Sequence, residues 1–321
     1  MKRFAAAFAA MMTAAALLAP ATGHAEYPER AVRVVVPFSA GGGMDAIARV
    51  VSKELSDSFG QSVVVENRAG GNGVVGILAM TNAEPDGYTL LIQALGLAIN
   101  PSIYSKLPYN GDELQPLTVL GFSPVYLAVN PKLPVNSLKE FVDLARKQRL
   151  RAAVFGLGAG RMMVEALRLE GGFEVDMVPY KGAAPAITGT IGGETDFVLM
   201  DAPSVQQYIT SGRLRGLAVA SEKRSPTLPE LPTMAEAGLP GVVVDFWYAM
   251  FTRPNVPADV QQTLNAAINR AIRTPEVASR MEAMGIIPNP MSLEDATRFY
   301  QGEVKRWGTV VKAAGVPTID N

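Results

Sequence analysis

The sequence predicts an α/β protein of two lobes, each built on a β-sheet flanked by helices. Two observations carry this prediction. Short strands alternate with helices in the first half of the chain, and a second, similar alternation begins near Val125. Strands separated by helices of this length are typical of right-handed βαβ units and of a largely parallel sheet. A length of 321 residues is also large for one hydrophobic core and ordinary for two domains.

Residues 1–25 are typical of a secretory signal peptide and are not expected in the mature fold. Lys2 and Arg3 precede an apolar stretch rich in Ala, Met and Leu, and the segment ends in the small-residue sequence Gly23-His24-Ala25. The apolar stretch is short for a span of the bilayer. We therefore expect cleavage after Ala25 and export of the mature protein.

The first lobe is expected to begin with a strand over Val32–Val36, where β-branched residues are consecutive. A helix follows over Asp45–Phe59, and Gly60 is a residue type that commonly ends a helix. The same signals continue along this half of the chain. They predict a strand over Val63–Val65, a helix over Val74–Asn82 and a strand over Tyr88–Ile92.

The second lobe is expected to begin with a strand over Val125–Val129. Ser137 is a suitable N-cap for the next helix, which runs to about Gln148, because Glu140 stands at the reciprocal position of a capping box. Later strands are expected over Ala152–Phe155, Val175–Pro179, Asp196–Met200 and Leu214–Ala220. Later helices are expected over Arg161–Glu170, Ala184–Gly192 and Pro203–Ser211.

The last part of the chain is expected to be loop and then helix. Ser225–Gly241 is rich in proline and has no clear period, so it is expected to be loop. Trp247 and Tyr248 lie between apolar runs, and we expect them to pack in the core or between the lobes rather than stack on a ligand. The C-terminal helices are expected over Ala258–Arg273, Pro275–Met284, Leu293–Trp307 and Thr309–Ala314.

Composition excludes several classes of function. The chain has no cysteine, and its single histidine, His24, belongs to the predicted signal peptide. The mature protein therefore lacks the Ser-His and Cys-His pairs of nucleophilic catalysis and the His or Cys ligands of zinc sites. A formal net charge of −1 provides no basic field for nucleic acid. We expect no catalytic residue, no metal and no cofactor.

The loop 37–45 is the strongest functional signal in the chain. It joins the first strand to the first helix through small residues and three glycines, so few side chains cover its backbone. Free N–H groups at a helix N-terminus, together with the positive end of the helix dipole, favour an anion. The candidate binding residues of this loop are Phe38, Ser39, Ala40, Gly41, Gly42 and Asp45.

Two other interpretations of this loop stay open, a plain turn and a dinucleotide site. Gly41–Ala46 matches G-x-G-x-x-A, and Glu66 follows the next strand as a ribose-binding acid would. However, residues 37–40 separate the strand from the first glycine, and an exported protein meets little NAD. Asp45 itself is expected to cap the helix or favour its dipole, with its oxygens used by backbone donors.

A second glycine-rich loop, Gly156–Arg161, leads into a helix of the second lobe and contributes Gly158, Gly160 and Arg161 as candidates. Arg161 has the wrong sign for the helix dipole, so it either grips a carboxylate or pairs elsewhere on the surface.

Asp201 follows a strand and either holds a ligand group or caps the next helix; Asp45 and Asp201 could meet across the cleft. Asn67–Gly73 is either a third polar loop or a surface turn.

Six short segments occur along the chain in a characteristic order. They are Val36–Asp45, Val64–Arg68, Pro85–Leu90, Ala98–Pro101, Val178–Gly182 and Leu231–Pro240. In this order they resemble the receptors of the tripartite tricarboxylate transporters, the periplasmic Bug proteins. Each segment is modest alone, but the ordered set is specific, and the resemblance runs from about Tyr27 to Val316.

The resemblance implies a two-lobed periplasmic-binding-protein (Venus-flytrap) fold that closes on a small organic carboxylate. It implies a first lobe of residues 26–123 plus 248–321 and a second lobe of residues 124–247. It further implies a monomeric periplasmic receptor that delivers its solute to a membrane permease with a large and a small subunit. An exported α/β enzyme acting on carboxylates and a ligand receptor for a sensor kinase remain as alternatives.

The resemblance also implies which residues bind. In such receptors the loop matching Phe38 to Gly42 and the segment matching Ala94 to Gly96 grip one carboxylate, and the second lobe contributes the loop matching Gly156–Arg161 and an aspartate matching Asp201. Those receptors usually carry serine or threonine in the second loop and a histidine in the next helix, where this chain has Leu157, Arg161 and Val164. We therefore expect the distal part of the ligand to be anionic or the pocket to be partly apolar.

Overall fold

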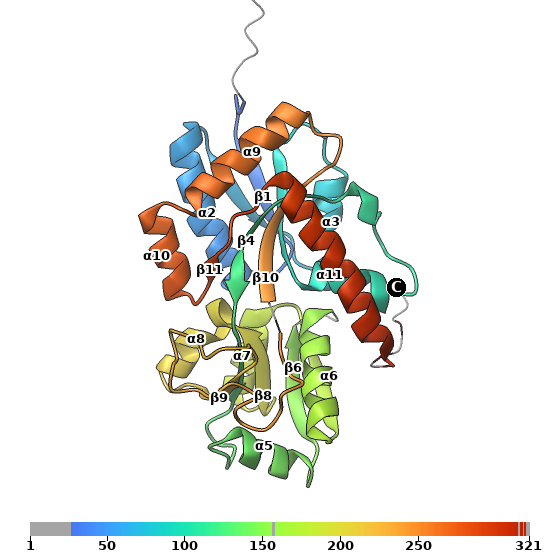
Figure 1. Ribbon diagram of the computed structural model, residues 1–321, viewed down its shortest axis with the longest axis vertical. Helices are drawn as coiled ribbons and strands as arrows, with labels where there is room; N and C mark the ends of the chain where they lie inside the picture. Colours follow the sequence, from blue (N-terminus) through green and yellow to red (C-terminus); the bar gives the residue numbers. More distant parts are fainter. Residues whose placement is uncertain (1–26, 156–157, 245, 314, 317, 319–321) are drawn as a thin grey trace, which may run out of the picture.

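Two β-sheets, each flanked by helices, form the two lobes of the protein. The computed structural model describes residues 27–155, 158–244, 246–313, 315–316 and 318. The predicted signal peptide and two residues of the second glycine-rich loop, Gly156 and Leu157, lie outside the described residues. In Figure 1 the lobe that contains β1 (Val32–Val36) and β10 (Phe246–Thr252) stands above the lobe that contains β6 (Leu150–Phe155).

The sheet of the first lobe has six strands in the order β11-β4-β10-β3-β1-β2. Its further strands are β2 (Val63–Asn67), β3 (Thr89–Ala94), β4 (Gln115–Ser123) and β11 (Ile287–Pro288). β1 pairs in parallel with both β2 and β3. β10 and β11 pair antiparallel with their neighbours.

The sheet of the second lobe has five strands in the order β7-β6-β8-β5-β9. Its further strands are β5 (Val125–Val129), β7 (Val175–Tyr180), β8 (Phe197–Asp201) and β9 (Arg215–Val219). β6 pairs in parallel with β7 and β8, whereas β5 pairs antiparallel with β8 and β9. Both sheets are therefore mixed, which corrects the expectation of largely parallel sheets.

The helices follow the predicted pattern closely. Those of the first lobe are α2 (Gly43–Phe59), α3 (Val74–Thr81), α4 (Gly96–Ile103), α9 (Ala258–Ala271), α10 (Pro275–Ala283) and α11 (Leu293–Ala313). Those of the second lobe are α5 (Leu138–Ala145), α6 (Ala159–Gly171), α7 (Ala183–Gly192) and α8 (Ala202–Thr210). α2 ends as predicted at Gly60, whose φ of 64° lies in the left-handed region that glycine adopts freely.

Ser137 is the N-cap of α5 as predicted, but the Glu140 carboxylate bonds the residue before the cap and the helix ends at Ala145 rather than near Gln148. The Ser137 hydroxyl accepts a hydrogen bond from the Glu140 N–H, and the Glu140 carboxylate accepts one from the N–H of Asn136. The loop-rich passage 225–241 is also confirmed, since it forms no helix and only one isolated bridge, at Thr233.

The two helices expected at the C-terminus are one helix, and the prediction of a break near Gly308 is wrong. α11 runs through Gly308, and a Cβ built there would lie 3.2 Å from the Ser102 hydroxyl of α4. The glycine thus lets two helices approach closely, and packing outweighs its low helix propensity. α4, β4, β10 and β11 were not predicted from the sequence.

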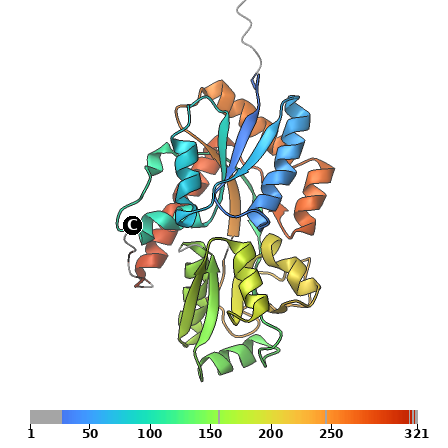
Figure 2. The same cartoon turned by 180° about the vertical axis from the view of Figure 1, so that it is seen from behind.

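The chain passes between the lobes near Pro124 and again near Val244. β4 and β5 lie on either side of the first passage, and the second leads directly into β10 of the first sheet. β10 begins at Phe246, so Phe246 and Trp247 lie in the first sheet, opposite Ser123 and Phe122 of β4. Figure 2 shows the two lobes from behind.

β10 is anchored to the core of the first lobe. Trp247 is fully buried and its indole Nε1 donates a 2.9 Å hydrogen bond to Glu303 Oε2 of α11. The neighbouring Tyr248 is also buried, but its hydroxyl reaches across to the second lobe. Core and interlobe packing, the roles predicted for these two aromatic residues, are confirmed.

Candidate ligand-binding cavity

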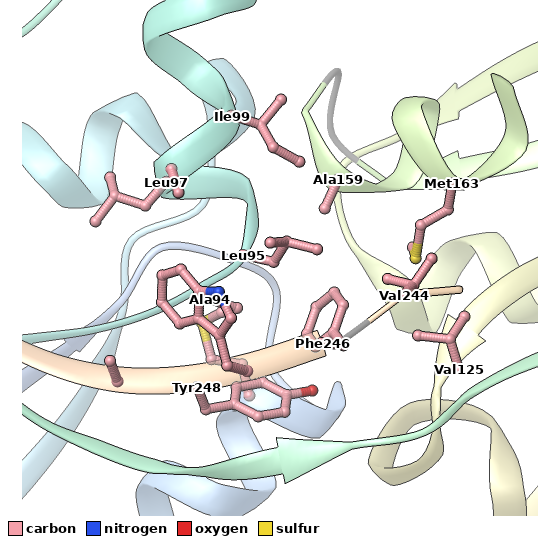
Figure 3. Packing of buried hydrophobic residues seen from close by; sticks show 14 of the residues in the cluster. Ala94, Leu95, Leu97, Ile99, Val125, Ala159, Met163, Val244, Phe246 and Tyr248 are labelled. Carbon is pink, nitrogen blue, oxygen red and sulfur yellow. The ribbon is translucent and has the colours of Figure 1, made fainter. Parts of the chain in front are cut away.

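A cavity of about 50 Å³ lies between the lobes, which are in contact around it. Leu95 of the first lobe and Ala159 of the second point into the same buried region as Phe246 (Figure 3). The residues that line the cavity come from both lobes: Phe38, Ser39, Gly42, Gly43, Met44, Asp45, Gln93, Ala94, Gly96, Asn100, Phe155, Gly158, Ala159, Ala183, Asp201, Ser204, Phe246 and Tyr248.

Five helices begin at this cavity. The lining residues Gly42, Gly96, Gly158, Ala183 and Asp201 are the N-cap or the first residue of α2, α4, α6, α7 and α8, respectively. The first N–H groups of a helix have no carbonyl partner within it, and the helix dipole places a partial positive charge there. Both lobes therefore present main-chain groups that favour an anion.

The first loop is held by the buried carboxylate of Asp45. Its Oδ2 accepts hydrogen bonds from the Gly41 N–H at 3.1 Å and from Arg49 Nε at 3.0 Å. Burial alone would raise the pKa of Asp45, but these hydrogen bonds outweigh it and lower the pKa. Asp45 is thus not the N-cap, which is Gly42. Its oxygen is used by a backbone donor, as expected.

The second carboxylate of the cavity, Asp201, joins the lobes. Its Oδ2 accepts hydrogen bonds from the Tyr248 hydroxyl at 2.5 Å and from the Ser204 hydroxyl at 2.9 Å. The Ser204 oxygen in turn accepts a 3.1 Å hydrogen bond from the N–H of Gly43. Asp201 and Ser204 of the second lobe are thus bonded to each other, and each also accepts a hydrogen bond from the first lobe, from Tyr248 and Gly43 respectively. Asp201 occupies the N-cap position of α8, but its side chain makes no capping hydrogen bond.

Burial governs the ionisation of this network. Burial raises the pKa of Asp201, and the hydrogen bonds from Tyr248 and Ser204 oppose that rise. The pKa of Tyr248 lies well above its usual value, because the phenol is buried beside the carboxylate. Tyr248 is therefore the neutral donor and Asp201 the acceptor at neutral pH.

Eight of the twelve predicted site residues line the cavity, and the two glycine-rich loops meet there as expected. The eight are Phe38, Ser39, Gly42, Asp45, Ala94, Gly96, Gly158 and Asp201. The other four are Ala40, Gly41, Gly160 and Arg161. The Gly41 N–H donates a hydrogen bond to Asp45 that helps to hold the first loop. Gly160 lies so close to β6 that a Cβ on it would be 2.5 Å from the Phe155 carbonyl oxygen. The guanidinium Nε of Arg161 lies 3.8 Å from Glu165 Oε1 of the same helix.

Several cavity residues were missed by the sequence analysis. Those with polar side chains are Gln93, Asn100, Ser204 and Tyr248; the others include Gly43, Met44, Phe155, Ala159, Ala183 and Phe246. Phe155 at the carboxyl end of β6 and Ser204 shortly after β8 were detectable, because ligands of open α/β sheets bind outside the carboxyl ends of the strands. Tyr248 has no such signal, since β10 itself was not predicted.

Asp45 and Asp201 are the acidic residues that line the cavity. Its lining residues, all of them described, include no lysine or arginine.

Within the described ranges no group of His, Cys, Asp and Glu could hold a metal ion, and no helix is both long and apolar enough to cross a membrane. Glu66, the acid of the dinucleotide interpretation, pairs instead with Arg33 and Arg68.

Replacing Asp45 with asparagine is expected to reduce the free energy of unfolding by about 1 kcal/mol at pH 7, because charge-assisted bonds to Gly41 and Arg49 are lost. The pKa of Asp45 is lowered in the fold, so its contribution is complete above the unfolded pKa and is lost as the pH falls through the folded pKa. Urea unfolding at pH 7 and pH 3 measures this. An equal difference between wild type and variant at both pH values would contradict the assignment.

Comparison with known proteins identifies relatives over nearly the whole chain. Residues 47–316 match the family described as tripartite tricarboxylate transporter family receptor. The chain is 35% identical to protein BugT of Bordetella pertussis in an alignment of 321 positions that covers 98% of each chain. The structure of Rpa4515 from R. palustris with adipate has a TM-score of 0.88 and 31% identity, and it covers 92% of this chain and 100% of that one. MatC (Rpa3494) from Rhodopseudomonas palustris with bound malate has a TM-score of 0.83 and 29% identity, with coverages of 89% and 100%.

Proposed function

The chain belongs to the tripartite tricarboxylate transporter receptor family, and from this premise we propose that it binds a small organic dicarboxylate in the cavity between its lobes. The observation that carries the proposal is the convergence of five helix N-termini on one cavity. Main-chain N–H groups at these ends replace the basic side chains that the lining lacks.

The distribution of these helices over both lobes supports an anion with a negatively charged group at each end. α2 and α4 begin at the cavity from the first lobe, whereas α6, α7 and α8 begin there from the second. One carboxylate would lie against residues 38–42 and Gly96, and the other against Gly158, Ala159 and Ala183. The dicarboxylates adipate and malate in the two similar structures support the same class of ligand.

The size of the cavity supports a small ligand. Its volume of about 50 Å³ exceeds the ~10–15 Å³ of accessible space that one water needs, but only by a few times. Phe155, Ala159, Ala183 and Phe246 give the walls apolar surface between the helix ends. A short carbon chain with polar ends matches this arrangement.

We also propose the cellular role that the family implies. The predicted signal peptide would deliver the receptor to the periplasm, where it would act as a monomer and pass its solute to a permease of a large and a small subunit. The alternatives are an exported enzyme acting on carboxylates and a receptor that feeds a sensor kinase. Turnover of a bound carboxylate would establish the first, and capture of a kinase rather than permease subunits the second.

A thermal-shift screen of the mature protein tests the ligand class. Succinate, malate and adipate are compared with their uncharged diamides, which match them in size and shape. At about one hundred times its dissociation constant a ligand adds roughly 2.7 kcal/mol to the stability of the protein. We expect a shift with at least one dicarboxylate and none with its diamide. Equal shifts with acid and diamide, or no shift with any carboxylate, would overturn the proposal.

A further inference from the structure

A second pocket of about 280 Å³ lies at the seam between the lobes, outside the cavity described above. The first lobe lines it with Phe38, Gly70, Gly71 and Gly73, and the second lobe with Pro179, Tyr180 and Lys181. Apart from Phe38, these residues belong to two segments that the sequence pattern singled out and that the binding cavity does not use, 67–73 and 178–182. We call this space the outer pocket.

The outer pocket adjoins the cavity directly. Phe38 lines both spaces. A Cβ built on Gly73 of the outer pocket would lie 3.5 Å from Phe38 Cζ and 3.3 Å from Nε2 of Gln93, which lines the cavity. On the other lobe, Lys181 is separated by one residue from Ala183 of the cavity. The ring of Phe38 therefore stands between the two spaces.

The two spaces differ in charge. The cavity contains the carboxylates of Asp45 and Asp201 and no basic side chain. Lys181 is the one charged residue among those that line the outer pocket, and it is exposed. Glu194 of the same lobe accepts a 2.9 Å hydrogen bond from the Tyr180 hydroxyl. Lys181 itself forms no ion pair with the described residues.

We propose that the outer pocket is a separate anion site at the mouth of the cavity, where the Lys181 ammonium attracts a carboxylate of the solute as it enters between the lobes. The inference rests on the proposed function, because it assumes an anionic solute. No basic side chain lines the cavity, so a carboxylate that approaches it from solution meets no attractive side-chain charge there. A cation at the mouth supplies such a charge at long range and accelerates capture.

Stopped-flow kinetics with the dicarboxylate that gives the largest shift in the screen test this proposal. We expect Lys181→Gln to lower the association rate constant about three- to ten-fold at 10 mM ionic strength, where screening is weak, and to have no effect at 1 M salt. The dissociation constant should change less than the association rate, because a group at the mouth lowers the barrier in both directions. Lys181→Arg should restore the rate.

Lys132→Gln is the matched control. It removes an exposed lysine from the same lobe, beyond the end of β5 that lies opposite Phe197 and thus away from Asp201. Its kinetics should equal those of wild type at low salt. An unchanged association rate in Lys181→Gln would overturn the proposal. A loss of affinity that appears only as faster dissociation would also overturn it, because Lys181 would then contact the bound solute. If no carboxylate binds wild type, the proposed function fails first, and the screen reveals this before any kinetics.

Discussion

Replacement of Gly43 by alanine is expected to weaken binding of the dicarboxylate about 100-fold or more without lowering the stability of the ligand-free protein. A Cβ at Gly43 would lie 2.7 Å from Asp201 Oδ2, 2.8 Å from Pro203 Cβ and 2.8 Å from the Ser204 hydroxyl. All three atoms belong to the second lobe, so the added methyl group acts on the contact between the lobes.

The size of this effect follows from two losses. The lobes must separate to admit the methyl group, and overpacking of a tight contact costs about 1–3 kcal/mol. The Gly43 N–H then loses its hydrogen bond to Ser204, which is worth about 1 kcal/mol. A total near 3 kcal/mol corresponds to about a 100-fold change in the dissociation constant. Isothermal titration calorimetry measures it directly.

The preceding residue provides the control. Gly42 has a φ of −86°, which any residue adopts, and a Cβ there would lie 3.8 Å from Ala183 Cβ, an ordinary contact. Gly42→Ala also keeps the main-chain N–H of this lining residue. It should therefore bind within about three-fold of wild type, since it loses no polar contact. Similar affinities of the two variants would show that the lobes do not close on Gly43 as described.

Local signals in the sequence were sufficient for most elements and for the first loop. The β-branched run of β1, the glycines of residues 41–43 and the left-handed Gly60 all act on their immediate neighbours, so they can be read without knowledge of the tertiary fold. Gly43 itself was counted as one glycine of that loop. Its close contact with Asp201 and Ser204 depends on residues more than 150 positions away.

Long-range pairing explains what was missed. β10 is a buried strand in the middle of a sheet, and its hydrophobic sequence has no alternation to distinguish it from other buried segments. Tyr248 could therefore be placed in the core, but not opposite Asp201. The two roles left open for Asp201 were also local choices. Its position at the N-cap of α8 is visible in the sequence, whereas its partner across the lobes is not.

Substitution of Tyr248 by phenylalanine is the second change expected to have a large effect. The variant keeps the ring and removes the hydroxyl that donates to the buried Asp201 carboxylate from the other lobe. A hydrogen bond to a charged group is worth about 1.5–3 kcal/mol, so the affinity for the dicarboxylate should fall roughly 10- to 100-fold at pH 7. Tyr126→Phe is the matched control, because the Tyr126 hydroxyl bonds Thr227 within the second lobe.

The pH dependence separates this role from simple packing. Burial raises the pKa of Asp201 in the closed protein, so closure takes up a proton as the pH falls toward that raised pKa. A protonated Asp201 no longer needs the Tyr248 donor to offset a buried charge. The loss of affinity caused by Tyr248→Phe should therefore be largest at neutral pH and shrink on acidification. Titration of the solute cancels when wild type and variant are compared at each pH. A loss that is independent of pH would mean that the hydroxyl contacts the solute or fills space, and that the carboxylate between the lobes is not its partner in closure.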